Sequence, residues 1–459
     1  MISQRNDFTA LLAEKIMDIN YSNLPKETIE KTKLSILDAI GCAVYGSDTP
    51  WSKIIVDYVR GLSAGKDSEV FVSNLKTDPA SASLANGTMV HSFELDDTFM
   101  PGKMHPGAVI IPAAMAVAES THSKGDLLIE AVVAGYEAMG RVALALDPNA
   151  AKERGWHITG ICGTFGAAAA TGKLIGLDSN QMVSAIGIAG TQSAGLFAFI
   201  ADGAMTKRLH PGKSSQSGVM AALLAKKGFQ GPSKILEAPD GGFLRAFSDR
   251  SNPSKLLKET GDKYVIDRTG FKLYSCCGSI NPALDAIKNL KEIHGIDLNQ
   301  IETVSVGVSK TVQDQCGWNY EPLSILQAQM SLKFCVACLV KNNSVFTDQF
   351  TEENIRNPEL IEYSKKVNVY VDSECNSIYP KKNPARVTIR SKEGSEFTTY
   401  VDEPKGLSEE GMVPKEEIFQ KFKVLTKSKL EDLKSNQVIE DVMHLDKLDN
   451  MNQILRILL

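Results

Sequence analysis

The chain concentrates groups that can transfer protons in one short segment. Residues 91–105 hold two imidazoles, three carboxylates and a threonine hydroxyl within a region otherwise rich in alanine and apolar side chains. Burying ionisable groups is costly unless they are paired or used, and acid–base chemistry requires groups with shifted pKa values. The segment therefore indicates an active site. Its groups are His91, Glu94, Asp96, Asp97, Thr98 and His105.

Three later motifs supply matching cations. They are the Gly-Trp-His sequence that ends at His157, the run from Lys207 to Lys213, and Lys272 in the sequence Phe-Lys-Leu-Tyr-Ser-Cys-Cys. Positive groups are needed wherever negative charge develops on a carboxylate during a reaction. The polar segment and these motifs together predict a cavity that binds an acidic small molecule.

The composition narrows the class of protein. A length of 459 residues exceeds one small core and predicts two or three structural units. The hydrophobic share of 43% and charged share of 23% are typical of soluble globular proteins. The net charge of -5 argues against nucleic acid as a partner. Neither a secretory leader nor an apolar run of membrane-spanning length is recognisable, so we expect a cytoplasmic protein with no membrane partner.

The eight cysteines do not indicate a disulfide framework, because they are scattered and lie mostly in apolar windows. Cys335 and Cys338 have the spacing of a redox or metal pair, but their neighbours are apolar and no second pair completes a zinc site. We expect them to be buried structural residues. Cys276 and Cys277 follow Lys272, and at most one of the two can line a cavity because adjacent side chains diverge.

Motifs for nucleotides and metals fail on inspection. The sequence 212–214 resembles the end of a phosphate loop, but position 207, where that loop requires glycine, holds lysine. The glycines between 160 and 166 have the wrong spacing for a dinucleotide fingerprint. No cluster of metal ligands and no cysteine triplet suited to an iron–sulfur site is recognisable. We therefore expect catalysis without a metal or cofactor.

Hydrophobic periodicity makes the first 250 residues almost entirely helical. Small residues between 160 and 170 recur at spacings of three and four, which lets helix backbones approach closely. We expect a large central helical bundle with the polar segment at its loops and helix ends. The expected helices span roughly residues 26–46, 79–91, 108–120, 125–146, 158–174, 179–194 and 213–227.

A different pattern begins near residue 265. Alternating residues predict strands over 303–309 and 367–371 and a hairpin over 385–401. Helices expected at roughly 280–294, 323–341 and 352–365 lie between the strands, which makes an α+β unit. The pattern is helical again from Pro414, and the charge-rich stretch 426–448 is typical of a solvated helix face.

In their order along the chain, these motifs resemble the MmgE/PrpD family, which includes 2-methylcitrate dehydratase, cis-aconitate decarboxylase and iminodisuccinate epimerase. The resemblance runs from about residue 8 to the C-terminus. It implies a mainly α fold and a homodimer. The implied parts are a helical domain from residues 1–265 and 406–459 and an inserted α+β lid domain over 266–405. The motifs are His91-x-x-x-x-Asp-Asp-Thr98, His105-Pro-Gly, Gly-Trp-His157 before a Gly-Thr-x-Gly helix, Thr-Lys207-x-Leu-His210 and Phe-Lys272-x-Tyr274.

The resemblance also implies which residues surround the pocket. Two departures weaken the case for cis-aconitate decarboxylase activity specifically. Glu94 stands where the decarboxylase members carry Asp, and the interval from Thr98 to His105 is one residue longer. The expected catalytic residues are Glu94, Thr98, His105, His157, Lys207 and Lys272. The expected substrate-binding residues are Asp97, Arg208, His210, Tyr274 and Cys277.

Family substrates are polycarboxylates, and the shared step makes or breaks a C–H bond next to a carboxylate or imine. Cations must be in place where charge develops, and a neutral histidine suits the base. We expect His157 or Lys272 to act as base or acid at carbon and His105 to assist the departure of hydroxide. Glu94 or Asp97 is expected to orient a histidine. The expected cations are Lys207, Lys272 and protonated His105 or His157.

The sequence thus predicts a cofactor-independent lyase that acts on a small di- or tricarboxylate, first of all by dehydrating a 2-methylcitrate-like hydroxy tricarboxylate. Three alternatives stay open: decarboxylation of a cis-aconitate-like acid, epimerisation of an iminodisuccinate-like dicarboxylate, and non-catalytic polycarboxylate binding by a dimer. Single residues have structural alternatives as well. Asp96 is equally suited to a helix cap or a salt bridge, and His91 fits a packed, hydrogen-bonded helix residue. Arg208 and Lys213 suit substrate carboxylates or a dimer interface.

Overall fold

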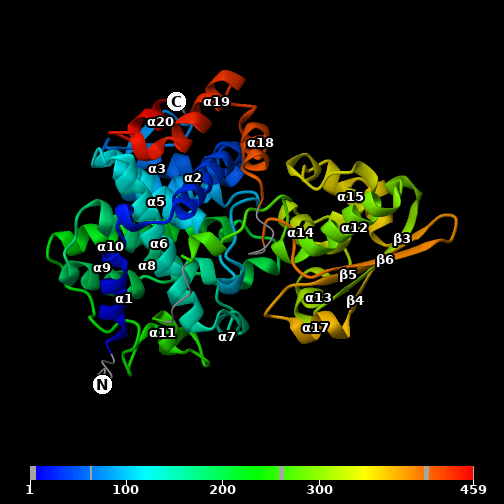
Figure 1. Cartoon of the computed structure of the whole chain (residues 1–459), viewed down its shortest axis with the longest axis horizontal. Coiled ribbons are helices and arrows are strands. Elements are labelled where there is room, and N and C mark those ends of the chain that lie inside the picture. Colours follow the sequence, from blue (N-terminus) through cyan, green and yellow to red (C-terminus); the bar gives the residue numbers. More distant parts are fainter. Residues whose placement is uncertain (1–6, 63–64, 258–262, 408–412, 458–459) are drawn as a thin grey trace.

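The computed structural model describes residues 7–62, 65–257, 263–407 and 413–457. Its helices dominate, and its strands are few. Figure 1 shows a body of packed helices beside a smaller body that carries a sheet. We call residues 274–401 the α+β part and the remaining described residues the helical part. The predicted mainly α class is confirmed, whereas the domain boundaries and the lid stay predictions.

The helical part contains most of the helices and one small ribbon. The helices are α1 (Phe8–Met17), α2 (Lys26–Gly46), α3 (Pro50–Gly61), α4 (Pro79–Val90), α5 (Gly107–Ser120), α6 (Gly125–Leu146), α7 (Pro148–Glu153), α8 (Ile158–Leu174), α9 (Ser179–Thr191), α10 (Thr206–Lys226), α11 (Phe243–Phe247), α18 (Lys415–Thr426), α19 (Asp432–Met443) and α20 (Asn452–Ile457). Strands β1 (Ser68–Val70) and β2 (Leu75–Thr77), which the sequence analysis missed, pair antiparallel.

The α+β part is built on a four-stranded sheet in the order β4-β3-β5-β6. Strand β3 (Ile301–Val308) pairs parallel with β4 (Val367–Val371) and antiparallel with β5 (Ala385–Ser391). The predicted hairpin is confirmed, since β5 pairs antiparallel with β6 (Glu396–Val401). The helices are α12 (Asn281–His294), α13 (Lys310–Cys316), α14 (Ile325–Met330), α15 (Leu332–Asn342), α16 (Pro358–Ser364) and α17 (Ser373–Ile378).

Most predicted helices agree with the structure within a few residues, and the exceptions have local causes. Helix α10 begins at Thr206, not near 213, and runs through Pro211, a residue type that usually ends or kinks a helix. The helix expected over 323–341 is broken at Ser331, whose side chain caps the second piece by accepting from Phe334 N–H. The helix expected over 352–365 is confined to α16. The stretch 426–448 is not wholly solvated, since Val438 and Val442 of α19 are buried.

Small residues set the close helix packing of the helical part, as the sequence predicted. A methyl group added at Gly212 of α10 would lie 2.2 Å from the Leu84 carbonyl oxygen of α4, and one at Gly166 of α8 would lie 2.9 Å from the Gly135 oxygen of α6. Such contacts leave no room for a side chain. The helices therefore pack backbone to backbone around the ends of α4, α8 and α10, where the polar residues lie.

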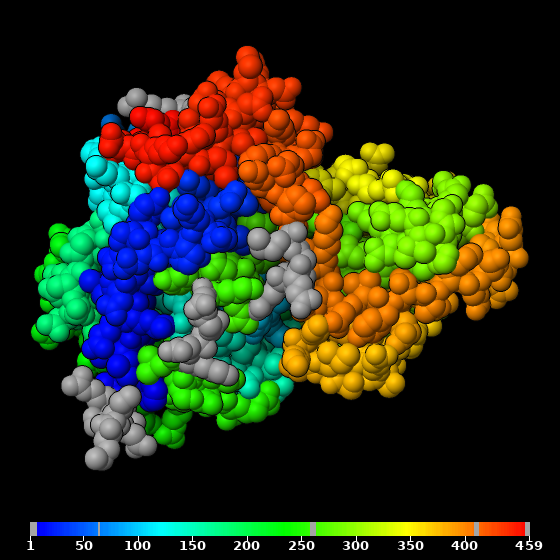
Figure 2. Space-filling model, in the orientation of Figure 1, coloured from blue at the N-terminus to red at the C-terminus, as the bar shows by residue number. Residues whose placement is uncertain are grey.

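The C-terminal helices lie against the N-terminal ones, as the red and blue surfaces in Figure 2 show. Helix α18 packs on α2, and Lys421 of α18 forms a buried ion pair with Asp38 at 2.7 Å. The same ammonium donates to the Leu95 carbonyl oxygen at 2.6 Å. Burial raises the pKa of Asp38, and Lys421 opposes that shift. The pair therefore ties the C-terminal helices to the backbone of the polar segment.

We expect Lys421→Met to lower the free energy of unfolding by about 3–5 kcal/mol, because it leaves the buried Asp38 carboxylate without a counter-charge. Lys429→Met is the matched control, since it breaks an exposed pair with Asp48 and should cost at most about 1 kcal/mol. Urea denaturation followed by circular dichroism measures both. Equal, small effects would contradict the structural role of the buried pair.

Candidate active site

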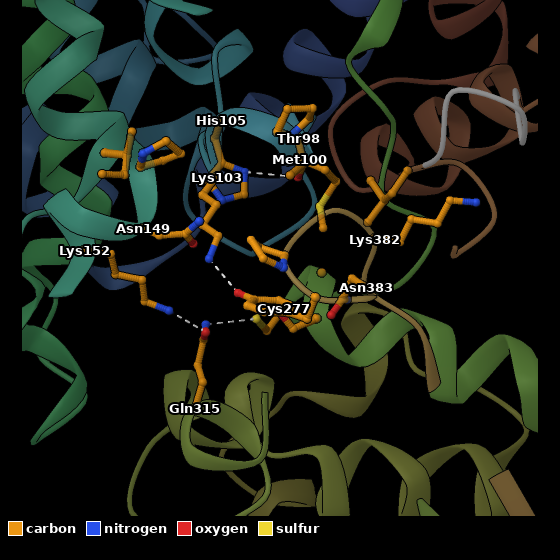
Figure 3. Close-up of a pocket in the computed structure, with 18 of the residues that line it drawn as sticks. Thr98, Met100, Lys103, His105, Asn149, Lys152, Cys277, Gln315, Lys382 and Asn383 are labelled. Atoms are coloured by element: carbon orange, nitrogen blue, oxygen red, sulfur yellow. Dashed lines mark hydrogen bonds between the residues drawn. The ribbon is translucent and has the colours of Figure 1, made fainter. Parts of the chain in front are cut away.

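A cavity of about 870 Å³ is lined by residues of both the helical part and the α+β part. Seven of the eleven predicted site residues line it, and Figure 3 labels Thr98, His105 and Cys277 among them. The structure thus brings together segments that are far apart in the sequence. The seven are Glu94, Thr98, His105, His157, Lys207, Lys272 and Cys277.

Backbone pairing positions the catalytic segments. Helix α4 ends at Val90, and the segment that follows it pairs with the segment before Lys272 through two hydrogen bonds between Thr98 and Gly270, at 2.8 and 2.9 Å. Lys207 is the second residue of α10. Because α10 packs closely on α4, the Lys207 side chain lies beside the segment that follows α4. Glu94 therefore meets cations from two distant segments.

Glu94 is shared by two buried lysines. Its carboxylate forms ion pairs with Lys207 and, at 3.4 Å, with Lys272, and all three side chains are buried. Burial alone would raise the pKa of Glu94, but Lys207 and Lys272 outweigh it and hold that pKa well below its usual range. Burial likewise opposes the charge of Lys272, yet Glu94 raises the pKa of this lysine above its usual value. The cluster is an ionised carboxylate with Lys272 held in its ammonium form.

The backbone at Glu94 is strained. Its φ of 58° lies in the left-handed region, which costs a residue with a side chain about 1–3 kcal/mol and is found mostly at functional sites. This conformation comes directly after the turn that ends α4 at His91. We infer that the two ion pairs hold the carboxylate in place against this strain.

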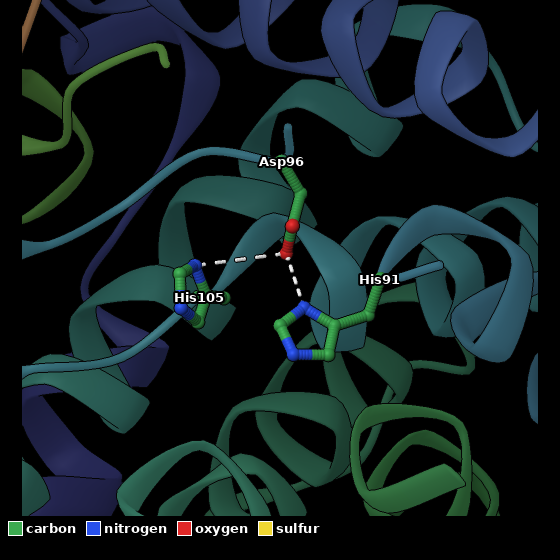
Figure 4. Close-up of side chains that lie close together, drawn as sticks. All are labelled: His91, Asp96 and His105. Atoms are coloured by element: carbon green, nitrogen blue, oxygen red, sulfur yellow. Dashed lines mark hydrogen bonds and ion pairs between the residues drawn. The ribbon is translucent and has the colours of Figure 1, made fainter. Parts of the chain in front are cut away.

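A second group of side chains consists of His91, Asp96 and His105 (Figure 4). Asp96 Oδ2 lies 2.7 Å from His91 Nδ1 and 3.7 Å from His105 Nδ1. The sequence analysis expected Glu94 or Asp97 to orient a histidine, and the structure instead places Asp96 in that position. His91 is buried and hydrogen bonded, in agreement with its structural interpretation.

His105 is held as a neutral imidazole. Burial first, and Lys272 second, lower the pKa of His105 to about 3. Its Nδ1 donates to the Asp97 carbonyl oxygen at 2.9 Å, so Nε2 is left as the acceptor nitrogen. Thr98 Oγ1 lies 3.3 Å from the same Nδ1 (Figure 3). The expectation of a protonated His105 is therefore wrong for the protein without substrate.

The group in Figure 4 also has the composition of a metal site, since its three ligand atoms lie within 4.8 Å of one another. Two observations oppose that function. His91 and Asp96 are hydrogen bonded directly, and the positive charge of Lys272 acts on both Asp96 and His105. A further cation would be repelled there. We interpret the group as a hydrogen-bonded pair of His91 and Asp96 that lies beside His105.

His157 forms a pair with a second imidazole. It is the residue before the first turn of α8, lines the cavity, and places Nδ1 2.9 Å from Nδ1 of His210, which does not line the cavity. Burial first, and His210 second, lower the pKa of His157 well below its usual range, and burial lowers that of His210 to about 4. A neutral His157 contradicts the expected imidazolium. When its Nδ1 donates to His210, Nε2 becomes a basic acceptor.

Besides His210, three predicted substrate-binding residues do not line the cavity. Asp97 accepts from Gly107 N–H at 2.8 Å and from the Tyr136 hydroxyl at 2.6 Å, which anchors the start of α5. Tyr274 donates its hydroxyl to Asp285 at 2.6 Å.

Arg208 is buried too, with its guanidinium 4.8 Å from the Trp51 ring centroid and donating to Gln329 at 3.3 Å. The polar groups of Asp97, Tyr274 and Arg208 are therefore used within the protein.

The sequence analysis also missed residues that line the cavity. Lys103 lies inside the segment 91–105 but was not predicted to be a site residue, whereas Lys152 stands in the short α7, which no motif marked. The α+β part adds Gln315 and Tyr379. The position of Lys103 within the polar segment 91–105 could have indicated that this lysine lines the cavity.

Two family models match the chain. The model of the MmgE/PrpD N-terminal domain matches residues 10–256, and that of the MmgE/PrpD C-terminal domain matches residues 274–445. The chain belongs to the MmgE/PrpD family. The predicted resemblance is confirmed, and with it the prediction of an enzyme of the MmgE/PrpD lyase type.

The chain is similar to cis-aconitate decarboxylases over most of its length. A cis-aconitate decarboxylase of Aspergillus terreus is 29% identical over 457 residues, which are 95% of this chain and 92% of that protein. A cis-aconitate decarboxylase-like protein of Aspergillus oryzae is 27% identical, over 98% and 97% of the two chains. The cis-aconitate decarboxylase of Homo sapiens is 26% identical, over 86% and 82%. Among the described residues, no helix has the length and apolar character needed to cross a membrane.

We expect Glu94→Gln to lower the pKa of Lys272, because burial then acts on the ammonium without the carboxylate that offsets it. Labelling with an amine-reactive reagent across a pH series, read by mass spectrometry, should show modification of Lys272 beginning at least about one pH unit lower than in the unchanged protein. Glu94→Asp keeps the charge and is the control. Identical labelling profiles for all three proteins would contradict the shared ion pair.

The neutral histidines of the site predict a loss of stability in acid. The unfolded chain binds a proton per histidine near pH 6.5, whereas the folded chain resists protonation down to about 3 at His105 and about 4 at His210. Stability contributed by these groups is full above about pH 6.5 and falls as the pH falls, by up to about 1.4 kcal/mol per pH unit for each histidine. Burial raises the pKa of Asp97 to about 7, so this carboxyl group makes the protein more stable as the pH falls. Its contribution offsets the loss of stability from one histidine.

His157→Gln tests this expectation, because it removes one of the three histidines. Between pH 6.5 and 4.5, the slope of the unfolding free energy against pH should decrease by up to about 1.4 kcal/mol per pH unit relative to the unchanged protein, which corresponds to one bound proton. Urea denaturation at several pH values measures the slope. An unchanged slope would show that His157 is protonated normally in the folded chain.

Proposed function

We propose that this protein is a carboxy-lyase that removes carbon dioxide from an unsaturated tricarboxylate of the cis-aconitate type. Two findings support the proposal. Named relatives that cover at least 86% of the chain are cis-aconitate decarboxylases, and the Lys207–Glu94–Lys272 cluster lies at the wall of the cavity. The sequence analysis placed dehydration first, and the relatives reverse this order.

The reaction makes two demands on the site. Loss of carbon dioxide from the CH2–COO⁻ arm leaves an allylic carbanion, whose charge spreads over the carbon–carbon double bond to the carbon next to another carboxylate. A proton added to that carbon gives methylenesuccinate. The site must therefore stabilise charge on a carboxylate and supply one proton to carbon.

The described groups meet both demands. Lys207 and Lys272 provide positive charge in a buried setting, where its effect on a developing anion is strong. Lys272 is the proposed proton donor to carbon, because its pKa is raised and the His105 and His157 imidazoles are neutral. Solvent at the open side of the cavity restores its proton. Asp96 acts through His105 as a positioning residue.

Dehydration of a 2-methylcitrate-like hydroxy acid is the second candidate. The neutral His157, oriented by His210, suits removal of a proton next to a carboxylate, and Lys272 would protonate the leaving hydroxide. Glu94 favours this candidate as well, since the resemblance places Asp there in the decarboxylase members. No contact among the described residues favours the epimerase or the non-catalytic binder, and we do not propose them. The homodimer and the cytoplasmic location stay predictions.

The experiment that tests the proposal uses purified protein with cis-aconitate in heavy water. We expect methylenesuccinate that carries one deuteron next to a carboxylate, together with carbon dioxide, detected by NMR. Lys272→Met should lower the rate by about 100-fold or more, because it removes both a preorganised charge and the proton donor. His157→Gln should have a smaller effect on this reaction than on dehydration.

Incubation with 2-methylcitrate separates the two candidates. A rise in ultraviolet enoate absorbance, without carbon dioxide release from cis-aconitate, would overturn the decarboxylase and support the dehydratase. Silence with both acids would overturn both candidates.

A further inference from the structure

Beyond the catalytic cluster, six further lysines line the cavity, among them Lys103 and Lys152. Lys103 follows a short 3-10 turn, Met100–Gly102, with a left-handed φ of 51°, and Lys152 lies in the last turn of α7. Figure 3 shows both side chains pointing into the cavity, with Lys152 directed toward Gln315 of the α+β part. Neither residue was assigned a function by the sequence motifs.

Both lysines have neutral partners. Lys103 Nζ donates to the Tyr379 hydroxyl at 2.5 Å, and Lys152 Nζ donates to Gln315 Oε1 at 2.6 Å. Within the described part of the chain, neither ammonium forms an ion pair with a carboxylate. A half-buried ammonium with only neutral partners gains little to offset its loss of hydration. The pair is therefore able to accept an anionic group.

The nearest acidic residues have other partners. Asp147 and Glu153 attract Lys103 from a distance, but Asp147 accepts from the backbone N–H groups at the start of α7, and both Glu153 oxygens accept from Arg250. Burial first, and the positive charge of Lys152 second, lower the pKa of Lys103 to about 8. The two lysines thus lie near enough to repel each other, and an anion between them would relieve that repulsion.

The lysine pair is connected to the catalytic cluster. Gln315 donates to Cys277 Sγ at 3.6 Å, and the positive charge of Lys207 acts on both Lys152 and Cys277. One wall of the cavity is therefore positive from Lys272 through Lys207 and Lys152 to Lys103. A ligand with carboxylates on separate arms matches this distribution of charge.

We propose that Lys103 and Lys152 bind the carboxylate arm that is remote from the reacting carbon, and that they make the cavity select tricarboxylates over dicarboxylates. The proposal rests on the proposed function only in requiring a polycarboxylate ligand. Lys207 and Lys272 then hold the carboxylates next to the reacting carbon, which a tricarboxylate and a dicarboxylate share.

A purely structural role makes a different prediction. If the two lysines only joined the helical part to the α+β part through Gln315 and Tyr379, their loss would lower stability and weaken every ligand by the same factor. Selective loss of the tricarboxylate distinguishes the two roles, because only a direct contact with the third arm depends on whether that arm is present.

The test is isothermal titration of the full chain with propane-1,2,3-tricarboxylate and with succinate, which lacks one carboxymethyl arm. The unchanged protein should bind the tricarboxylate more tightly. Lys103→Met and Lys152→Met should each weaken tricarboxylate binding about tenfold, as expected for loss of one charge-assisted hydrogen bond, and succinate binding less than twofold. The ionic strength must be the same throughout, since salt screens such contacts.

Lys255→Met is the matched control. Lys255 lies on the exposed rim of the same cavity and is assigned no ligand contact, so its loss removes the same charge with an expected change under twofold for both acids. Equal weakening of the two acids by Lys103→Met and Lys152→Met, or no weakening of either, would overturn the proposal and leave the proposed function intact. Failure of the unchanged protein to bind either acid would instead overturn both.

Discussion

The architecture of the site depends on one buried carboxylate that two lysines share. An unpaired charge in such an interior costs several kcal/mol, so neither the glutamate nor the lysines can be buried there alone. Lys207 reaches Glu94 from the start of α10 and Lys272 from the segment before the α+β part. The cluster therefore joins three distant stretches of chain, and it keeps Lys272 in the ammonium form in which it is useful.

The surrounding groups follow from this constraint. Burial, reinforced by Lys272 at His105 and by His210 at His157, lowers the pKa of both imidazoles and keeps them neutral, and each is held by a hydrogen bond through Nδ1. The lysines of the site thus carry positive charge and donate protons, whereas the neutral imidazoles can accept a proton. The ion pair of Lys421 with Asp38, and its contact with the Leu95 carbonyl oxygen, hold the same segment from the opposite side.

The helices and strands that have a clear periodic pattern of apolar residues could be predicted from the sequence. Apolar periodicity located six helices of the helical part within a few residues, namely α2, α4, α5, α6, α8 and α9, and alternation located β3, β4 and the hairpin of β5 and β6. The start of α10 was missed because Pro211 lies inside the helix, and proline there usually breaks a helix. The ribbon of β1 and β2 was missed because strands of three residues have no measurable period.

The motifs also placed seven residues at the cavity, but they did not give the direction of every side chain. Asp96 and Asp97 are adjacent, and the fold turns the first toward the histidines and the second toward Tyr136. Tyr274 and Arg208 have protein partners from other elements, which no spacing reveals. Lys152 lies in a short helix without a motif, so its place at the cavity arises only from tertiary packing.

The most direct test is a crystal structure of the protein with propane-1,2,3-tricarboxylate, which has the three carboxylates but no reacting double bond. The account predicts two carboxylates within hydrogen-bond distance of Lys207 and Lys272, with Glu94 still paired, and the third arm between Lys103 and Lys152. A ligand bound elsewhere, or bound in this cavity without contact to Lys207 or Lys272, would contradict the central role of the shared carboxylate and its two lysines.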